Sequence, residues 1–486
     1  MPRKYFILIL IGLFSINSYA QQCDCDATFN WVRTTFEEND AGFAYALRSK
    51  GQEAYAQHNK RFDQKITEVQ NLTQCRELVV QWLSFFRSGH WSFNRSRPSQ
   101  NTSTANTLND NEIIAMYKSW DTYTVDPEEF KSYLSKKDKV DFEGIWTNGP
   151  YEIGIKKENN DYVGFIIKAD GIYWTPNQIK LKIHSDNSSV YYMRDHSAEN
   201  FPKTELIGHN YLQMGFVSLK RKWPEVKTAP EVERYIKAIE SNSPYLERLN
   251  QNSLLLRIPS FSSSNKKYID SVLTANKSLI GKSENLIIDI RNNGGGSDRS
   301  YQELIPILYT NSIRSVGVEY LSTPLNNQRM IDFIEKPEYE FNDEEKQWAR
   351  DSYQKLSMQL GKFVNLNENV TSITRRDSIY TYPKQIAILI NERNGSTAEQ
   401  FLLLAKQSKK VKLYGTTTRG VLDISNMYRV PSPCGNFELS YGLSRSMRIP
   451  HMAIDDKGIA PDYFIDKDIP KHQWIDFALK VLSEDN

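Results

Sequence analysis

A serine stands where an apolar strand, a turn and a helix meet, in the segment ILINERNGSTAEQFLLLAK. This serine, Ser396, is followed by Thr397, and Glu399 lies three residues after it, which is the spacing of a helix capping box. The same place suits a nucleophile, because the hydroxyl lies beside a helix N-terminus and the N–H of Thr397 can help to hold an oxyanion. The local pattern therefore leaves two roles open for Ser396, a helix cap and a nucleophile.

A run of three glycines follows another apolar strand, in ENLIIDIRNNGGGSDRS. Gly294, Gly295 and Gly296 cost backbone entropy, so the run favours close approach between the backbone and a ligand or a developing anion. The segment contains neither G-x-G-x-x-G nor G-K-[ST], which makes phosphate binding a poor interpretation. The glycines are therefore candidates for an oxyanion hole, and a plain tight turn is the alternative.

Serine is a weak nucleophile and needs a neighbouring base such as histidine or lysine. His90, in the segment GHWSF, is one of seven histidines and follows the helix-like run CRELVVQWLSFFRS. This segment alone does not distinguish a structural histidine at a helix end from a base. His451, in RIPHMAIDD, is a second candidate.

The elements that must position these residues alternate between strand and helix after residue 230. Apolar segments typical of buried strands are separated by helical segments such as STAEQFLLLAKQSK; the strands are SLLLRIPSF, ENLIIDIR, IAILINE and KVKLYG. This alternation predicts βαβ units with helices on both faces of a sheet. Ligands of such sheets bind where strands end and loops begin, which is where Ser396 and the glycine run occur.

The chain of 486 residues is long enough for several domains. Residues 1–20 have the basic start, short apolar run and small residues of a secretory signal peptide. Residues 21–135 are predicted to form a helical region carrying His90, residues 140–225 a small antiparallel β domain, and residues 230–486 an α/β core. No motif in the β domain identifies a ligand.

The net charge and the hydropathy of the chain indicate which partners and which cellular compartment to expect. The formal net charge is +2 and no long basic run occurs, which argues against nucleic acid as a partner. After cleavage at Ala20, no apolar segment reaches the ~20 residues that a membrane-spanning helix needs. We therefore expect an exported protein, periplasmic or secreted, without an integral membrane segment. A lipid anchor at Cys23 is the less favoured alternative.

The cysteines fit an exported protein. Export permits disulfides, and Cys75 can pair with Cys23 or Cys25. Together with Cys434 these cysteines match no common zinc spacing, so neither a metal nor another cofactor is expected.

Four blocks in the second half of the chain resemble, in order, the C-terminal processing (tail-specific) protease family of serine peptidases. The blocks are IIDIRNNGGG, INERNGSTAEQFLLLAK, LYGTTTRG and DDKGIAPDYFI, and the resemblance covers roughly residues 250 to 470. It implies a protease core of ClpP/crotonase-like βαβ units, so that residues 230–486 would form an α/β serine peptidase core. It also implies that Ser396 is the nucleophile, that the substrate is a peptide or protein and that no cofactor is required.

The resemblance also bears on the base. In the bacterial processing branch a lysine follows a G-x-x-T-x-G block, but here Gly415–Gly420 is followed by Val421. Arg419 cannot replace the lysine, because guanidinium does not deprotonate in proteins. In the tricorn-like branch the base is a histidine far upstream, in a D-G-H-T-like block after a helix. His90 matches that block, with Trp91 where a small hydroxyl residue is usual, so the chain resembles the lysine-less branch more closely.

The same branch implies an acidic partner for the histidine. Its glutamate corresponds by spacing to Asp455, shortly before the ending Gly458–Asp462, and Asp456 is the alternative. We therefore expect a serine peptidase with a Ser-His-Asp type triad of Ser396, His90 and Asp455. The alternative is a catalytically inactive protein that binds peptides or other ligands on the same scaffold.

Overall fold

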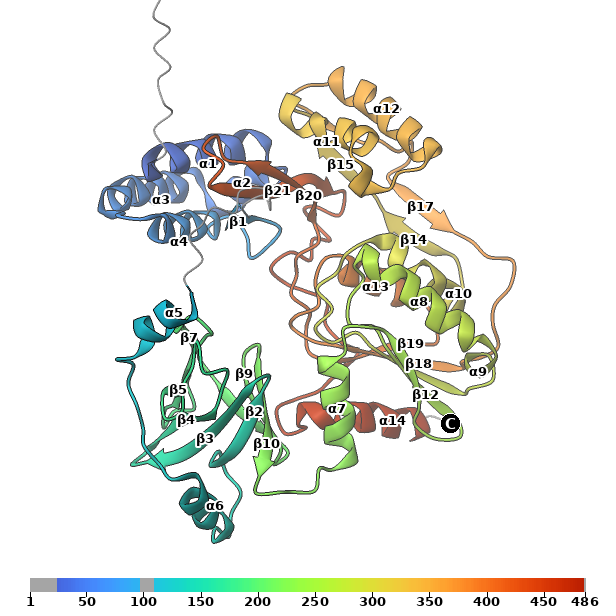
Figure 1. The fold of residues 1–486 in the computed structure, drawn as a ribbon. Coiled ribbons are helices and arrows are strands. Elements are labelled where there is room, and N and C mark those ends of the chain that lie inside the picture. The colour runs from blue at the N-terminus through green and yellow to red at the C-terminus, as the bar shows by residue number, and fades with distance from the viewer. Residues whose placement is uncertain (1–23, 97–108, 485–486) are drawn as a thin grey trace, which may run out of the picture. The chain divides into compact units, whose positions relative to one another are not determined.

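The computed structural model describes residues 24–96 and 109–484 (Figure 1). The chain divides into two compact units, each built from segments that are distant in sequence. The segments of the first unit are 1–97, 314–374 and 420–458, and those of the second are 98–313, 375–419 and 459–486. The expected signal peptide and Cys23 lie outside the described residues. Within the described ranges, no helix combines the length and the apolar composition needed to cross a bilayer.

The first unit begins with a group of helices around an aromatic core. Phe29, Phe36 and Trp82 are almost fully buried in this core, and their rings meet edge to face. Such contacts add to the free energy gained from burying the rings. The helical elements are α1 (Cys25–Asn39), α2 (Phe43–Lys50), α3 (Gln52–Lys65), η1 (Ile66–Glu68) and α4 (Leu72–Leu83).

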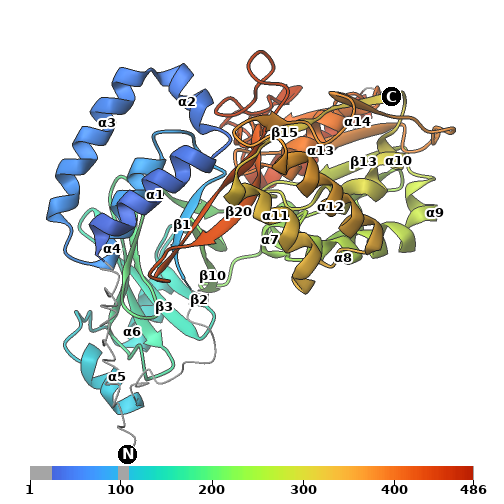
Figure 2. The ribbon, with the colours of Figure 1, turned by 90° about the horizontal axis from the view of Figure 1, so that it is seen from above.

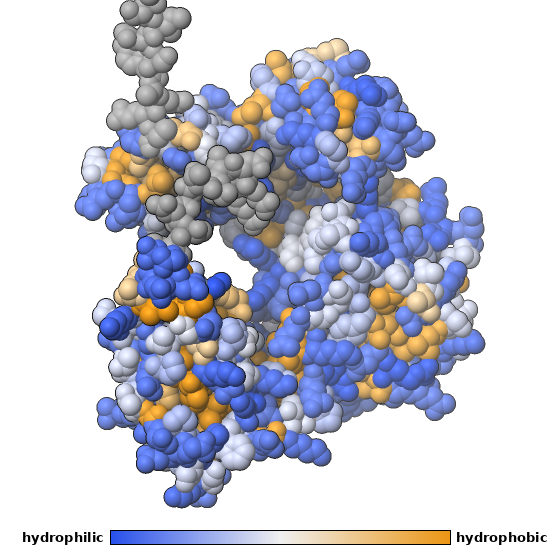
Figure 3. Space-filling view, in the orientation of Figure 1, coloured by the Kyte–Doolittle hydropathy of each residue, from blue (hydrophilic) through white to orange (hydrophobic). Residues whose placement is uncertain are grey.

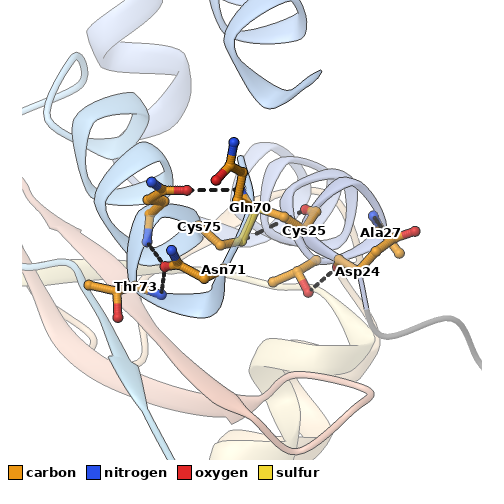
Figure 4. The surroundings of a disulfide bond; sticks show 9 residues. Asp24, Cys25, Ala27, Gln70, Asn71, Thr73 and Cys75 are labelled. Carbon is orange, nitrogen blue, oxygen red and sulfur yellow. Dashed lines mark hydrogen bonds between the residues drawn. A yellow bond between two sulfur atoms is a disulfide. The ribbon is translucent and has the colours of Figure 1, made fainter. Parts of the chain in front are cut away.

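A disulfide bond fastens the first helix of this group to the last (Figure 4). Cys25 and Cys75 form it, with their Cα atoms 5.6 Å apart, which settles one of the two pairings left open by the sequence. Cys434 is also disulfide-bonded. Both joined helices begin with side-chain caps: Asp24 accepts a hydrogen bond from the N–H of Ala27, and Asn71 caps α4.

An antiparallel sheet completes the first unit. Its strands run in the order β1-β21-β15-β16, and β20 also pairs with β21. Helices α11 (Pro324–Glu335) and α12 (Asp343–Ser357) pack side by side in this unit (Figures 1 and 2). The sheet strands are β1 (Ser92–Arg95), β15 (Val318–Leu321), β16 (Phe363–Val364), β20 (Ile424–Pro431) and β21 (Phe437–Ser446); β14 (Ile313–Val316) and β17 (Thr371–Thr374) form a separate pair.

The second unit contains an antiparallel sheet of nine strands. The strand order is β7-β6-β5-β4-β3-β2-β10-β9-β8, and Trp146 and Trp174 are fully buried in its core. The helices α5 (Asp110–Tyr117) and α6 (Pro127–Ser135) precede it. Its strands are β2 (Gly144–Asn148), β3 (Tyr151–Glu158), β4 (Asp161–Lys168), β5 (Ile179–Ile183), β6 (Ser189–Tyr192), β7 (Ala198–Phe201), β8 (Thr204–Ile207), β9 (Tyr211–Met214) and β10 (Val217–Trp223).

Lys180 is fully buried in this β domain and has no carboxylate partner within ion-pair distance among the residues that the structure describes. The Nζ atom of Lys180 lies 3.9 Å from the ring centroid of Trp174, 4.5 Å from that of Tyr151 and 4.8 Å from that of Tyr191. Burial lowers the pKa of Lys180 from its ordinary value of 10.5 to about 7. The unfolded chain therefore binds more protons than the native protein between about pH 7 and 10, so stability should rise with pH across that window.

We expect Lys180→Met to raise the free energy of unfolding at pH 7, because it removes a charge that the apolar core solvates poorly. The gain should be a few kcal/mol at most, because each unit by which burial lowers the pKa corresponds to about 1.36 kcal/mol. Urea unfolding at pH 7 and pH 9 measures it, with Lys182→Met on the same strand as the control. A stability of Lys180→Met that rises with pH as steeply as that of the wild type would contradict this prediction.

The remaining part of the second unit is the mostly parallel sheet expected from the alternating sequence pattern. Its strand order is β11-β12-β13-β18-β19-β22, in which only β11 runs antiparallel to its neighbour. The central strands are fully buried, and α14 packs against one face through Trp474 and Ile475. The strands are β11 (Tyr245–Arg248), β12 (Ser253–Arg257), β13 (Asn285–Asp289), β18 (Gln385–Ile390), β19 (Val411–Gly415) and β22 (Tyr463–Phe464); the helices are α7 (Pro230–Glu240), α8 (Ser263–Ala275), α9 (Lys277–Ile280), η2 (Asp298–Leu304), α10 (Ile305–Leu308), α13 (Thr397–Ala405), η4 (Lys471–Gln473) and α14 (Trp474–Glu484).

Hydrophobic side chains on the face drawn in Figure 3 occur in small groups among hydrophilic ones. Phe216 and Phe464, both in the second unit, are among the most exposed large apolar side chains, at 65% and 66%. Isolated apolar residues on a surface are ordinary. An exposed aromatic ring becomes informative only where it lines a pocket.

Candidate active site

Ser396 lies between β18 and α13, as the sequence predicts. It is the N-cap residue of α13 and forms a capping box with Glu399, whose carboxylate accepts a hydrogen bond from the Ser396 N–H at 3.2 Å. The backbone of Ser396 has φ 55° and ψ −126°, a conformation that is unfavourable for a residue with a Cβ atom. Capping does not exclude attack, because a hydroxyl that accepts through a lone pair keeps its proton for a base.

The buried carboxylate of Glu399 connects three of the sequence blocks. It accepts a hydrogen bond of 2.6 Å from the Thr418 hydroxyl, which in turn accepts the N–H of Ile459 at 2.7 Å. The chain of contacts therefore runs from the Ser396 loop through the G-T-T-T-R-G block to the G-I-A-P-D block. A charge-assisted hydrogen bond in a buried place is strong, so this network fixes the start of α13.

Three asparagines bind the Ser396 loop to the loop after β13. Asn391 accepts the N–H of Asn292 through Oδ1 at 2.9 Å and donates its Nδ2 to the Asn292 side-chain oxygen at 2.8 Å. Asn394 donates to the carbonyls of Ile290 and Asn293, at 2.5 and 3.1 Å. No periodic pattern predicts these roles, and the signal that could have found them is the concentration of amides directly after two apolar strands.

The three glycines occupy different environments. A Cβ atom on Gly295, whose φ is +106°, would lie 2.8 Å from both Ser396 Cβ and Thr397 N. Gly296, with φ +148°, leaves equally little room, because its Cβ would lie 2.2 Å from the Phe261 carbonyl oxygen. Gly294 is open, with no atom within 4 Å of an added Cβ. Of the three glycines, Gly295 is therefore the one that packs directly against the Ser396 loop.

The expected oxyanion-hole set needs one correction. The N–H of Gly295 already donates to Asn293 Oδ1 at 3.0 Å, so Gly295 provides close approach and no free donor. Among the described residues, no hydrogen bond engages the N–H of Gly294, Gly296 or Thr397. These three N–H groups remain candidates for holding an oxyanion.

Gly295→Ala is expected to lower activity at Ser396 by about 10²-fold or more, because the methyl group must displace Ser396 or Thr397 and misplacement of about 1 Å costs that much. Gly294→Ala is the matched control: it adds the same methyl group in open space and keeps its N–H. The steady-state rate of peptide hydrolysis by each variant, compared with the wild type, measures the loss. Equal losses in the two would contradict the packing argument.

His90 lies in the first unit, in the segment between α4 and β1. Its Nδ1 hydrogen-bonds the carbonyl oxygen of Ile424. Since a carbonyl only accepts, Nδ1 carries a proton in this hydrogen bond. If His90 acts as a base, it must therefore act through Nε2.

A buried ion pair holds the backbone around His90, which has φ 54°. The guanidinium of Arg87 donates to the carbonyls of Gly89 and His90, at 2.9 and 2.7 Å. It also makes two bonds, of 2.7 and 2.6 Å, to the carboxylate of Asp40, whose side chain has no exposed surface. Planar guanidinium suits this forked arrangement. No sequence signal connected Arg87 with Asp40, which lies 47 residues earlier.

Asp455 was expected to hold His90 directly, and the structure shows that its carboxylate also holds nearby backbone. Its carboxylate accepts backbone N–H groups from Leu422 and Asp423, at 2.6 and 2.7 Å, and from Ile424 at 3.2 Å. Asp455 thus fixes the segment whose Ile424 carbonyl meets the His90 ring. Burial and the neighbouring carboxylate of Asp423 raise the pKa of Asp455 to about 6.

The other two candidates from the sequence have different surroundings. The carboxylate of Asp456 accepts the N–H of Ser88 at 3.2 Å, two residues before His90. His451 is exposed in a turn. The structure thus places Asp455, Asp456 and the His90 segment together in the first unit.

The site residues expected from the sequence form two groups. Ser396, Thr397 and Gly294–Gly296 lie together in the second unit, whereas His90 and Asp455 lie together in the first. The pairing of His90 with Ser396 stays a prediction. Within the part of the chain that the structure describes, no group of three or more His, Cys, Asp or Glu side chains could hold a metal ion.

One protein-family model matches the second half of the chain. Residues 252–465 match the model of peptidase family S41, and this segment contains both the glycine loop and Ser396. This match supports a serine-type peptidase. No curated protein matches the sequence significantly.

Solved structures resemble the chain over most of its length. Mature CPAF matches at 14% identity and a TM-score of 0.50, with 94% of this chain and 96% of that chain covered. Mature CPAF complexed with lactacystin gives 14% identity, a TM-score of 0.52 and coverage of 94% and 98%. The photosystem II D1 C-terminal processing protease covers 93% and 96% at 13% identity, with a TM-score of 0.37. At such identities the two CPAF structures indicate a shared fold.

Proposed function

We propose that this chain is an exported serine peptidase in which Ser396 attacks the peptide carbonyl and His90 is the general base. The observation that carries the proposal is the geometry at Ser396. The serine is held in a strained conformation at the start of α13, and Gly295 packs against it. That arrangement supports a nucleophile better than a plain helix cap, which would need no strain and no glycine loop.

The reaction would proceed by acyl transfer. Nε2 of His90 takes the proton of Ser396 as Oγ attacks, and the tetrahedral oxyanion is held by the free backbone N–H groups. The imidazolium then protonates the leaving amine, and a water molecule attacks the acyl-enzyme by the same route. The partial positive charge at the N-terminus of α13 favours the developing anion.

In this proposal, Asp455 acts on His90 indirectly, through the backbone of residues 422–424. A carboxylate beside imidazolium stabilises its charge directly, whereas a carbonyl mainly orients the ring. Asp455 holds residues 422–424, and Ile424 orients His90, so Asp455 is a positioning residue. The absence of a lysine at Val421 and the role of His90 support placement in the tricorn-like branch, on a core of ClpP/crotonase type.

A serine-directed fluorophosphonate probe tests the proposal. We expect covalent labelling of the wild-type protein at Ser396, located by peptide mass spectrometry, and loss of labelling in His90→Asn. A folded wild-type protein that resists labelling at every pH would favour the non-catalytic binding protein on the same scaffold. Comparison of the mature N-terminus with residue 21 tests export.

A further inference from the structure

A pocket of about 560 Å³ lies in the second unit beside the loops of the candidate active site. Asn292 and the segment Asn391–Arg393 line it, and one residue separates each of them from the glycine run and the Gly395-Ser396 turn, respectively. Phe216, from the turn between β9 and β10, lines it from the β domain. The pocket is therefore lined by the same two loops that carry the glycine run and Ser396.

The turn that carries Phe216 is built to present an aromatic ring. Gly215 has φ +52°, and a Cβ atom there would lie 2.5 Å from the Phe201 ring, so the turn requires glycine at this position. The rings of Phe201 and Phe216 meet edge to face, with centroids 5.3 Å apart. Phe216 nevertheless stays 65% exposed. A fixed aromatic ring that lines a pocket is the kind of side chain that anchors an apolar group of a ligand.

Most charged side chains that line the pocket are already neutralised. Lys203 pairs with Glu205, Lys471 lies 3.5 Å from Glu392, and Arg291 is bound by Asp289 at 2.7 Å. Over the described residues, Arg393 and Glu240 are the lining charges without an ion pair. Of these two, Arg393 lies on the loop of Ser396, three residues before it.

We propose that this pocket is a substrate subsite that takes a large apolar side chain against Phe216 and a neighbouring acidic side chain at Arg393. This inference rests on the proposed peptidase function and specifies the class of peptide. An extended chain covers ~3.3 Å per residue, so Arg393 lies within about 10 Å of Ser396 along the backbone. A bound peptide would therefore reach the pocket with residues about two to four positions from the bond under attack.

Cleavage of a proteome-derived peptide library by the wild type first defines the preference. We expect enrichment of Phe, Leu or Met within four residues of the cleaved bond, beside Asp or Glu. Phe216→Ala should remove the apolar enrichment, and Arg393→Gln the acidic one. The matched control is Phe464→Ala, which deletes an equally exposed ring that does not line the pocket.

A double-mutant cycle then tests direct contact. For a peptide with Phe at the selected position, Phe216→Ala should lower kcat/KM about 10-fold, mainly through KM; for the Ala peptide it should change kcat/KM less than about twofold. Arg393→Gln should likewise remove the preference for Asp over Asn in matched peptides. Equal losses for both peptides of a pair would overturn the subsite.

Binding to Ser396→Ala separates failure of the subsite from failure of the peptidase proposal. A fluorescently labelled peptide that carries Phe and a neighbouring Asp should bind Ser396→Ala, as measured by fluorescence anisotropy. Adding Phe216→Ala to the Ser396→Ala variant should weaken this binding. Binding with this dependence, but without hydrolysis by the wild type, would retain the subsite and overturn the peptidase function. Hydrolysis that is insensitive to Phe216 and Arg393 would retain the function and overturn the subsite.

Discussion

Ser396→Ala is expected to lower peptide hydrolysis by at least about 10⁴-fold while both units remain folded. Loss of the nucleophile of a serine peptidase removes the covalent route altogether, and losses of about 10⁶-fold occur in comparable systems. The residual rate would come from the oxyanion donors and from substrate binding, which the substitution leaves in place. Initial rates on a peptide substrate, measured at high enzyme concentration, are sufficient to detect a change of this size.

The same substitution also removes a helix cap, so stability must be measured beside activity. Loss of an N-cap hydroxyl costs about 1 kcal/mol, which is too little to unfold a stable unit. Asn109→Ala is the matched control, because Asn109 caps α5 through a complete capping box in the same unit. We expect both variants to lose similar stability and only Ser396→Ala to lose activity. Undiminished hydrolysis by folded Ser396→Ala would remove the nucleophile assignment.

The parallel sheet was predictable because each buried strand carries its own signal. β12, β13, β18 and β19 are short apolar runs between helices, and their order along the chain matches their order in the sheet. Ser396 was predictable for the same reason, since a strand, a turn and a capping box fix its place locally. The sequence also identified the three glycines, but only as a group.

What each glycine does depended on contacts that no local pattern encodes. Gly294 and Gly295 are adjacent and identical in type, yet one faces open space and the other lies against Ser396. Asp455 shows the same limit: its spacing marked it as a partner of the site, but its direction toward three backbone N–H groups comes from tertiary packing. Sequence spacing identifies candidates, and the hydrogen bonds decide what each one touches.

His90 illustrates how a strained residue depends on distant support. The chain around it is held by Arg87 and Asp40, while its ring is held by Ile424, a residue more than three hundred positions away. Asp423 adds to the support from that side: it is fully buried and accepts bonds from Arg448 and from the N–H of Asp455, at 3.0 and 2.9 Å. Such a scaffold fixes a ring more firmly than the end of a helix alone would, which favours a functional role for His90.

His90→Asn is expected to lower hydrolysis by about 10⁴–10⁶-fold, close to the effect of removing the nucleophile. Asparagine changes little else at this position, because it tolerates the positive φ of His90 and its amide N–H can still donate to the Ile424 carbonyl. The hydrogen bond and the backbone are therefore retained, and only the ability to take a proton is lost.

The matched control for this substitution is His451→Asn, which changes the competing histidine in an exposed turn of the same unit. We expect it to keep kcat/KM within about twofold of the wild type. Combining His90→Asn with Ser396→Ala should add little to either single loss, because the two side chains act as one unit. Losses that multiply in the double variant would show that His90 and Ser396 act independently. A large loss in His451→Asn alone, with His90→Asn active, would transfer the role of base to His451.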